Sequence, residues 1–169
     1  MTELISKSDI DKRVGELAAE INRTFGREDV VVICILKGAF IFTADLVRRL
    51  DFPLIVEFME LSSYHLAVST DKVVVTKDIA TDLTGKNVLV VEDIVDTGST
   101  LRFIHSHLAA KNPASLRFCV LLDKPAKRKK HTPLPDFTGF VIPDEFVAGY
   151  GLDYDQKHRN IPNIVIKET

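Results

Sequence analysis

The nine residues from Glu92 to Thr100 carry the densest set of groups in the chain that could do chemistry. They hold three carboxylates and end in Thr-Gly-Ser-Thr. Backbone N–H groups can approach a ligand closely at Gly98, the neighbouring hydroxyls add donors, and the dipole of a following helix favours an anion. The end of the segment therefore predicts a cradle for a phosphate monoester. It matches neither a Walker loop nor G-x-G-x-x-G, because the required Lys and glycine spacings are missing.

The three carboxylates, Glu92, Asp93 and Asp96, predict a second kind of ligand, because they would repel a phosphate bound beside them. A ribose offers two vicinal hydroxyls, and hydroxyls donate hydrogen bonds to carboxylates. An acidic pair beside an anion cradle therefore predicts a ribose 5-phosphate site. The structural alternative is that Asp96 or Thr97 caps the next helix. Capping explains one residue, but not three acids and three hydroxyls in nine positions.

Apolar strands precede this segment and two other polar clusters. The strands are Val30–Leu36, Asn87–Val91 and Leu116–Leu122, each a continuous apolar run of the kind buried on both faces of a sheet. The polar clusters that follow are Lys37-Gly38, Glu92–Thr100 and Asp123-Lys124. In open α/β sheets the ligand site lies outside the carboxyl ends of the strands. We therefore expect the three clusters to meet.

The remaining periodicities complete an α/β fold, a mainly parallel sheet flanked by helices. Helical spacing predicts helices over residues 10–25, 39–50 and 100–111, with a capping box at Ser8 and Asp11 for the first. Residues 54–61 and 73–76 are predicted strands, and 62–72 a loop. The proline-broken last third, with apolar fragments at 137–142, 146–150 and 164–166, predicts a small C-terminal hood. The basic run 127–131 is interpreted as a solvated loop face, with a subunit or polyanion contact as the alternative.

Length and composition limit the possible classes of protein. The chain has 169 residues, 46% of them hydrophobic, which predicts a single domain over 1–169 with a core at about 8–124 and a hood at about 125–169, joined by the N-terminal segment. A net charge of −2 argues against a nucleic-acid partner, and no apolar run is long enough for a membrane span. No secretory signal is visible, and Cys34 and Cys119 lie in apolar runs. We expect reduced core thiols and a cytoplasmic protein.

The segment from Val90 to Thr100 resembles the phosphoribosyl-pyrophosphate (PRPP) signature of the type I phosphoribosyltransferases. Other blocks narrow the resemblance to the hypoxanthine-guanine phosphoribosyltransferases, the 6-oxopurine branch of that family. It runs from about residue 30 to 166, and it predicts the type I phosphoribosyltransferase fold. The blocks are Leu36–Phe40, Ser62–Tyr64, Leu121–Pro125 and Ile142–Tyr154.

The resemblance implies a set of residues that bind PRPP. Thr97, Gly98, Ser99 and Thr100 would hold the 5′-phosphate. The acidic pair would bind the ribose hydroxyls, with Mg²⁺ bridging those hydroxyls and the pyrophosphate. Two further groups would contact pyrophosphate: the Lys37-Gly38 loop, whose family counterpart often has a non-proline cis bond, and Arg159. The metal ligands implied are Glu92, Asp93 and Asp153.

The resemblance also implies how a purine is held. Asp96 would act as general base or acid for the purine ring proton. Lys124 would donate to the exocyclic oxygen and select oxo over amino purines, because an ammonium has no acceptor to offer an adenine amine. Phe146 would stack on the base, Val147 would meet its edge, and Asp153 would reach a second Mg²⁺. The implied reaction is Mg²⁺-dependent purine salvage, which makes IMP or GMP from PRPP and an oxopurine in a homodimer or homotetramer.

The implied lid departs from the family pattern. Ser63 and Tyr64 would close over the pyrophosphate and exclude water. The residue after this pair is usually Gly in bacterial members, whereas here it is His65, followed by the apolar Leu66 and Val68. His65 restricts a backbone that glycine would leave free, so the family pattern does not predict how fast this lid opens and closes.

Two other functions are compatible with parts of the pattern. A regulator on the same fold, binding a nucleotide or PRPP together with RNA or DNA, would keep the PRPP loop but would not need the purine-binding hood or Asp96. A related enzyme could use another base such as xanthine or a pyrimidine. The combination of Lys124 and Phe146 favours an oxopurine, but it does not separate hypoxanthine, guanine and xanthine.

Overall fold

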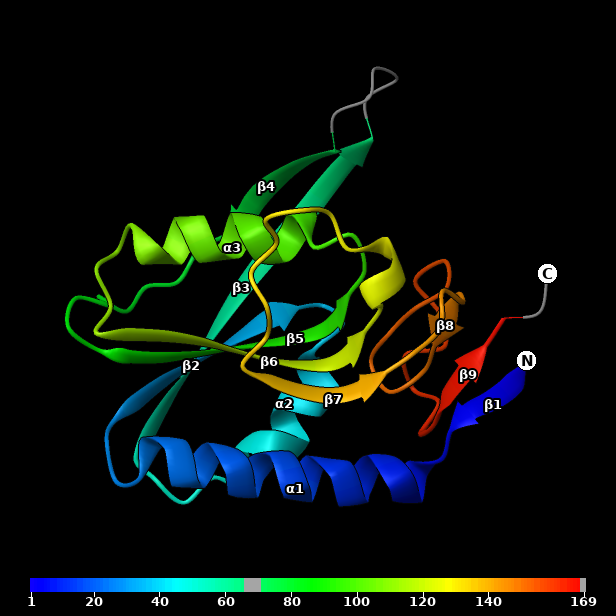
Figure 1. The fold of residues 1–169 in the computed structure, drawn as a ribbon, viewed down its shortest axis with the longest axis horizontal. Helices are drawn as coiled ribbons and strands as arrows, with labels where there is room; N and C mark the ends of the chain where they lie inside the picture. The colour runs from blue at the N-terminus through cyan, green and yellow to red at the C-terminus, as the bar shows by residue number, and fades with distance from the viewer. Residues whose placement is uncertain (66–70, 168–169) are drawn as a thin grey trace.

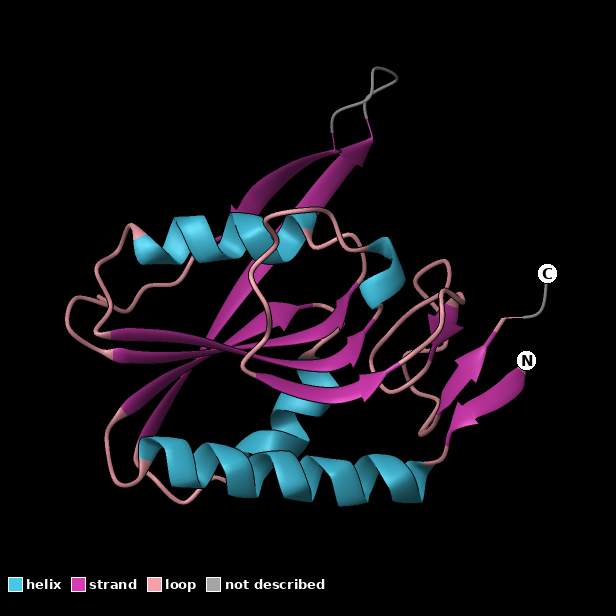
Figure 2. Cartoon of the chain, viewed as in Figure 1, coloured by secondary structure: helices cyan, strands magenta, loops and turns pink. Residues whose placement is uncertain are grey.

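The computed structural model describes residues 1–65 and 71–167, and a six-stranded sheet flanked by helices forms its centre (Figures 1 and 2). The pairs β3–β2, β2–β5, β5–β6 and β6–β7 are parallel, and β4 pairs with β3 in the antiparallel direction. The predicted mainly parallel α/β fold is confirmed. In spatial order the strands are β4 (Asp71–Lys77), β3 (Leu54–His65), β2 (Val30–Leu36), β5 (Asn87–Val95), β6 (Ser115–Asp123) and β7 (Phe137–Val141).

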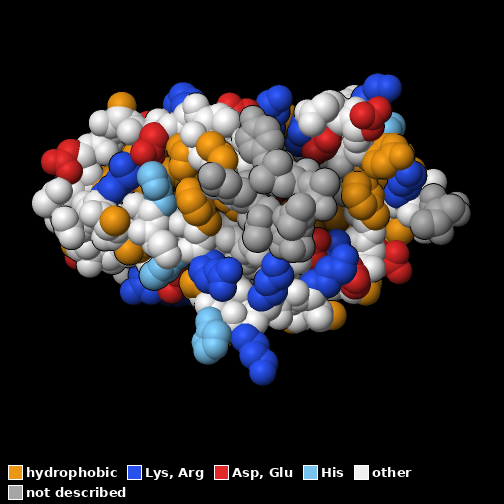
Figure 3. All heavy atoms as spheres, turned by 90° about the horizontal axis from the view of Figure 1, so that it is seen from above, with side chains coloured by type: hydrophobic (Ala, Val, Ile, Leu, Met, Phe, Trp, Pro, Cys, Tyr) orange, Lys and Arg blue, Asp and Glu red, His pale blue; other side chains and the backbone are white. Residues whose placement is uncertain are grey.

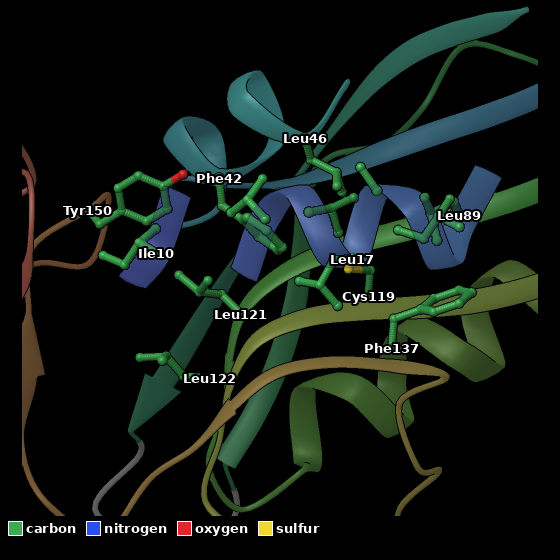
Figure 4. Close-up of a cluster of buried hydrophobic side chains, with 14 of the residues drawn as sticks. Ile10, Leu17, Phe42, Leu46, Leu89, Cys119, Leu121, Leu122, Phe137 and Tyr150 are labelled. Carbon is green, nitrogen blue, oxygen red and sulfur yellow. The ribbon is translucent and has the colours of Figure 1, made fainter. Parts of the chain in front are cut away.

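Helices cover both faces of this sheet because its central strands are apolar on both sides. Helices α1 (Lys7–Phe25) and α2 (Phe40–Val47) lie on one face, and α3 (Ser99–Ala109) lies on the other (Figure 1). In Figure 4, Leu17 of α1 and Phe42 of α2 lie close to Cys119 and Leu121 of β6. None of the helices in the described ranges is both long and apolar enough to cross a membrane.

The two cysteines are buried and free, as predicted. Burial raises the pKa of the Cys34 thiol to about 11 and that of Cys119 further. Both thiols therefore stay protonated in the core at neutral pH.

The N-cap residue of α1 differs from the predicted one. Ser6, not Ser8, caps the helix, and its hydroxyl accepts a hydrogen bond from the backbone N–H of Asp9 at 3.1 Å. Both serines have an aspartate three residues later, so the sequence pattern alone does not distinguish them. Strand β1 ends at the buried residue Ile5, and the helix begins directly after it, with Ser6 as its N-cap residue.

The prediction of a loop over residues 62–72 is wrong at both ends, where the structure has strands. Strand β3 continues to His65 and β4 starts at Asp71, and the two form an antiparallel hairpin at the edge of the sheet. The hairpin extends beyond the body of the molecule in Figure 1. A strand pair outside the core needs no apolar alternation, which is why its polar sequence resembles a loop. Leu66 and Val68, at the expected lid tip, lie outside the described residues.

The hood is smaller than predicted at its amino-terminal side. Fragment 137–142 was expected in the hood, but β7 pairs in parallel with β6 and extends the main sheet. The connection that leads to it has only a short 3₁₀ helix, η1 (Pro125–Lys127), and so it does not look like a βαβ crossover in the sequence. The hood itself is an antiparallel sheet of β1 (Thr2–Ile5), β9 (Ile164–Ile166) and β8 (Val147–Ala148). The N-terminal segment joins it as expected.

Candidate active site

The acidic segment predicted from the sequence lines a cavity of about 210 Å³ at the carboxyl end of β5. Its walls come from one continuous stretch, in which the carboxylates precede the phosphate-type loop and the first turn of α3. The lining residues are Glu92, Asp93, Ile94, Val95, Asp96, Thr97, Gly98, Thr100 and Leu101. A larger groove of about 510 Å³, lined by Pro53, Lys86 and Asn87, lies at the opposite edge of the sheet and contains none of the predicted site residues.

Glu92 and Asp93 form an acidic pair in which Glu92 is buried and Asp93 is half-buried. Glu92 is 7% exposed, its Oε1 accepts from the Asp93 N–H at 3.2 Å, and its Oε2 is buried without a hydrogen-bond partner. Burial, and then the negative charge of Asp93, raise the pKa of Glu92 well above its usual range. Burial also raises the pKa of Asp93. Two carboxylates held in this way are suited to a cation or to hydroxyl donors.

Asp96 leaves one acceptor free in the cavity. Its Oδ1 is buried and has no hydrogen-bond partner. Asp96 does not cap the next helix, because the N-cap residue of α3 is Gly98, with φ 82° and no side-chain cap. Of the two capping candidates, Thr97 does contact the start of the helix, through the Ser99 N–H. Asp96 is therefore placed to accept a proton or a hydrogen bond from a ligand.

The phosphate-type loop carries its hydroxyls at the start of α3, and the Thr132 side chain lies against Gly98, since a Cβ added there would lie 2.2 Å from Thr132 Cγ2. The Thr97 hydroxyl donates to Ser99 Oγ at 3.2 Å and accepts from the Ser99 N–H at 3.3 Å. Ser99 itself is not part of the cavity wall, whereas Thr97, Gly98 and Thr100 are. The loop and the positive end of α3 therefore face the same cavity as the carboxylates.

The basic run is less solvated than the sequence indicates. Four of its residues are exposed and Arg128 is half-buried, and Figure 3, which looks down on α3, shows Lys and Arg side chains gathered on this face. However, the Lys129 N–H donates to the Thr97 carbonyl at 2.9 Å and its ammonium donates to Ser99 Oγ at 3.3 Å. Lys127 pairs with Asp144 of the hood at 2.8 Å. The run therefore borders the candidate site, which its charge alone could not reveal.

The Lys37-Gly38 loop meets the acidic pair as expected. The Leu36–Lys37 peptide bond is cis. A Cβ added to Gly38 would lie 1.6 Å from Asp93 Oδ2, so the carboxylate lies directly against the loop backbone. The Lys37 side chain is exposed. Of the three polar clusters, this one and the acidic segment are in contact through Gly38 and Asp93.

The third cluster, Asp123-Lys124, lies beside the end of β5. The Lys124 N–H donates to the Val95 carbonyl at 2.9 Å. Its side chain is buried, with the ammonium 4.0 Å from Asp144 Oδ1. Asp123 is buried too and forms an ion pair with Arg128. All three clusters thus lie at the carboxyl ends of the central strands β2, β5 and β6.

The hood presents an aromatic surface next to these strand ends. Phe146 is 53% exposed, and its ring makes an edge contact with Tyr154 at 5.6 Å between centroids. Val147 is buried in β8. A large exposed aromatic ring of this kind is available to stack on a planar ligand.

Arg159 and Asp153 contact each other, which the sequence could not show. Arg159 Nη2 lies 2.9 Å from Asp153 Oδ1, and Nη1 donates to the Gly151 carbonyl at 2.8 Å. In the described part of the chain, no three His, Cys, Asp or Glu side chains are grouped to hold a metal ion. Asp153 therefore does not form a three-ligand cluster with the acidic pair. Ser63 and Tyr64 lie in β3, where they pair with Val73 and Lys72 of β4.

Comparisons with known proteins agree with this geometry. The family model for the phosphoribosyl transferase domain matches residues 2–155. The chain is 45% identical to the hypoxanthine phosphoribosyltransferase of Haemophilus influenzae, over 98% of this chain and 96% of that protein. It is 46% identical to the hypoxanthine-guanine phosphoribosyltransferase of Aquifex aeolicus, over 98% and 93%.

A solved structure gives the same result. The crystal structure of a hypoxanthine-guanine phosphoribosyltransferase from Bacillus anthracis has a TM-score of 0.94 at 45% identity, covering 99% of each chain. The fold is therefore that of the type I phosphoribosyltransferases. The chain belongs to the phosphoribosyltransferase family, in the branch of the hypoxanthine and hypoxanthine-guanine phosphoribosyltransferases.

Proposed function

We propose that this protein, acting as a single phosphoribosyltransferase domain, transfers the 5-phosphoribosyl group of PRPP to hypoxanthine or guanine. The products are IMP or GMP and pyrophosphate. The observation that carries the proposal is one cavity in which the acidic pair, an unpaired oxygen of Asp96 and a phosphate-type loop lie together. The activities named for the curated relatives agree with it.

The acidic pair fits a ribose bound together with Mg²⁺. Glu92 Oε2 is buried without a partner, and burial raises the pKa of both acids, so a bound cation would stabilise their ionised forms. Mg²⁺ is typically held by one or two carboxylates plus substrate oxygens and waters, which two acids can satisfy. When bound, it would neutralise the charge of the leaving pyrophosphate. Asp153, held by Arg159, would reach a second Mg²⁺.

The chain's own residues would then act on the sugar and the base. The loop 97–100 holds the 5′-phosphate, and the Lys37-Gly38 loop with Arg159 binds pyrophosphate. As the bond from the anomeric carbon to pyrophosphate breaks, positive charge on the ribose is stabilised by the nearby carboxylates. The purine nitrogen bonds to that carbon, and Asp96 Oδ1 accepts the ring proton. A positioned base contributes about 10²–10⁴-fold to the rate.

The hood supplies the purine contacts in this proposal. Phe146, exposed on the hood, stacks on the base, and Val147 meets its edge through the backbone. The Lys124 ammonium donates to the exocyclic oxygen of an oxopurine. Ser63 and Tyr64, on the β3–β4 hairpin, close over the pyrophosphate and exclude water.

We also propose a cytoplasmic homodimer or homotetramer. Val56 and Phe58, 36% and 41% exposed on β3, offer an apolar surface that suits a subunit contact. Two buried free thiols suit a reducing compartment.

An activity assay with PRPP, Mg²⁺ and each purine in turn tests the proposal. We expect product with hypoxanthine or guanine and none with adenine. Asp96→Asn is expected to keep PRPP affinity but to lower kcat by about 10²-fold or more, because Asn cannot accept the proton. The exposed Asp51→Asn serves as the control.

Two results would contradict these roles. Full activity of Asp96→Asn excludes Asp96 as the base. PRPP binding without transfer to any purine would instead favour a regulator on the same fold.

A further inference from the structure

The pyrophosphate loop, defined here as residues 36–39, is enclosed on two sides. Asp93 lies against Gly38 on one side. On the other side the hood approaches, and a Cβ added to Gly151 would lie 2.2 Å from the Gly38 carbonyl oxygen. Gly151 also has φ +102°, a backbone conformation that favours glycine. The loop therefore has its position fixed jointly by the carboxylate and by the hood turn.

The hood turn is fastened through Tyr150. Its backbone N–H donates to the Ile161 carbonyl at 2.7 Å, and its hydroxyl donates to Asp45 Oδ2 at 2.6 Å. Figure 4 shows the hydroxyl directed toward α2, with the ring beside Ile10 and Phe42. Asp45 lies in α2, the helix that begins directly after the pyrophosphate loop. The hydrogen bond thus connects the hood turn, which encloses the loop on one side, with the helix that continues from the loop.

Two further features keep this connection in place. Burial, together with Asp45, raises the pKa of Tyr150 far above its usual value, so the phenol remains a donor throughout the neutral range. The Gly151 carbonyl accepts from Arg159 Nη1 at 2.8 Å, which fixes the other side of the turn.

We infer that Tyr150 and Asp45 are positioning residues for the pyrophosphate group of PRPP, acting through their hydrogen bond on the loop at 36–39. The inference rests on the proposed function. The hydroxyl contributes little to the core itself, because the ring of a phenylalanine would occupy the same apolar surroundings. Its removal should therefore alter the placement of the loop more than the stability of the fold.

Tyr150→Phe tests the inference directly. We expect the KM for PRPP and the inhibition constant of pyrophosphate to rise about five- to tenfold, the size of a typical net hydrogen-bond contribution. The KM for hypoxanthine should stay within about twofold, since the purine contacts lie elsewhere in the hood. Asp45→Ala should behave like Tyr150→Phe, whereas Asp45→Asn should restore wild-type values, because its amide oxygen still accepts from the phenol.

Two controls separate positioning from general loosening. Asn163→Ala removes a hood hydrogen bond of the same length, from Asn163 Nδ2 to Glu3 Oε2 at 2.6 Å, which involves neither Tyr150 nor Asp45. Arg48→Met removes the second partner of Asp45, a largely exposed ion pair. Both variants should leave pyrophosphate inhibition unchanged.

Calorimetric titration with magnesium pyrophosphate compares the pyrophosphate affinity of the wild type and the variants without turnover. Equal pyrophosphate affinity of the wild type and Tyr150→Phe would overturn the inference, whether or not transfer is observed. A parallel rise of both KM values would also overturn it, by indicating a purely structural role. Failure of the wild type to make any nucleotide would contradict the proposed function alone.

Discussion

At the scale of single residues, the acidic pair is costly to the fold and useful to the proposed reaction. Glu92 lies in the interior beside Asp93, and burial raises its pKa well above the usual range. In the folded chain its ionisation is therefore less favourable than in the unfolded chain. Such a site is retained for binding rather than for stability.

Replacing Glu92 by Gln should therefore stabilise the protein while weakening PRPP binding. A folded-state pKa above the unfolded value means that the wild type loses stability as pH rises from about 4.5 through the folded pKa. The variant avoids this loss and can donate an amide hydrogen bond to Asp93. In metal-free buffer we expect a gain of about 1 kcal/mol or more at pH 8 and none below about pH 4.5.

Urea denaturation at several pH values measures this gain, and PRPP kinetics measure its cost. The specificity constant for PRPP should fall about tenfold with the loss of one charged acceptor. The exposed Glu16→Gln should change neither quantity by much. A gain that is the same at every pH would contradict the assignment to ionisation.

At the scale of elements, the end of β6 depends on one buried ion pair. Asp123 is 10% exposed and Arg128 is 16% exposed at their side chains. Their contact holds η1 and the following chain beside Lys124. A buried carboxylate that loses its partner is left uncompensated.

Arg128→Met should lower the free energy of unfolding by about 3 kcal/mol. Arg117→Met, on β6 itself, is the control, because its 3.4 Å pair with Asp136 is more exposed and should cost less than about 1 kcal/mol. The double variant Asp123→Leu with Arg128→Met should recover most of the loss. Urea denaturation distinguishes these outcomes, and equal costs for the two arginines would contradict the prediction.

Elements differ in how far the sequence could predict them. Strand β2 is predicted with its observed bounds, because a β-branched run buried on both faces has a strong pattern. The β3–β4 hairpin and β7 were misassigned, because one lies outside the core and the other follows an irregular connection. The three polar clusters could be predicted to meet, since parallel strands end at one edge. The contacts of Tyr150 and Arg159 depend on how the hood packs, which local spacing does not encode.

At the scale of the whole molecule, the hood depends on strand β1. Strand β9 pairs with β1 on one side and with β8 on the other, and β8 carries Val147. Ile5 is buried in this arrangement. Loss of β1 therefore removes the support of the strand that holds the purine-binding part of the hood.

Deleting residues 2–5 should lower the Tm by about 5–10 °C, as expected for a loss of about 2–3 kcal/mol in a chain of this size. The KM for hypoxanthine should rise more than the KM for PRPP. Thr2→Ser, which keeps the strand backbone, is the control. Thermal unfolding and steady-state kinetics measure both effects, and an equal rise of the two KM values would contradict the role of β1.

The order of strands in the hood also has a consequence for protein synthesis. The middle strand of that sheet, β9, is made last, whereas its neighbour β1 is made first. On the ribosome, β1 has to wait unpaired while β2, β5 and β6 can already assemble with their helices. The half of the enzyme that would bind the phosphorylated sugar can thus take shape on a nascent chain before the half that would receive the base.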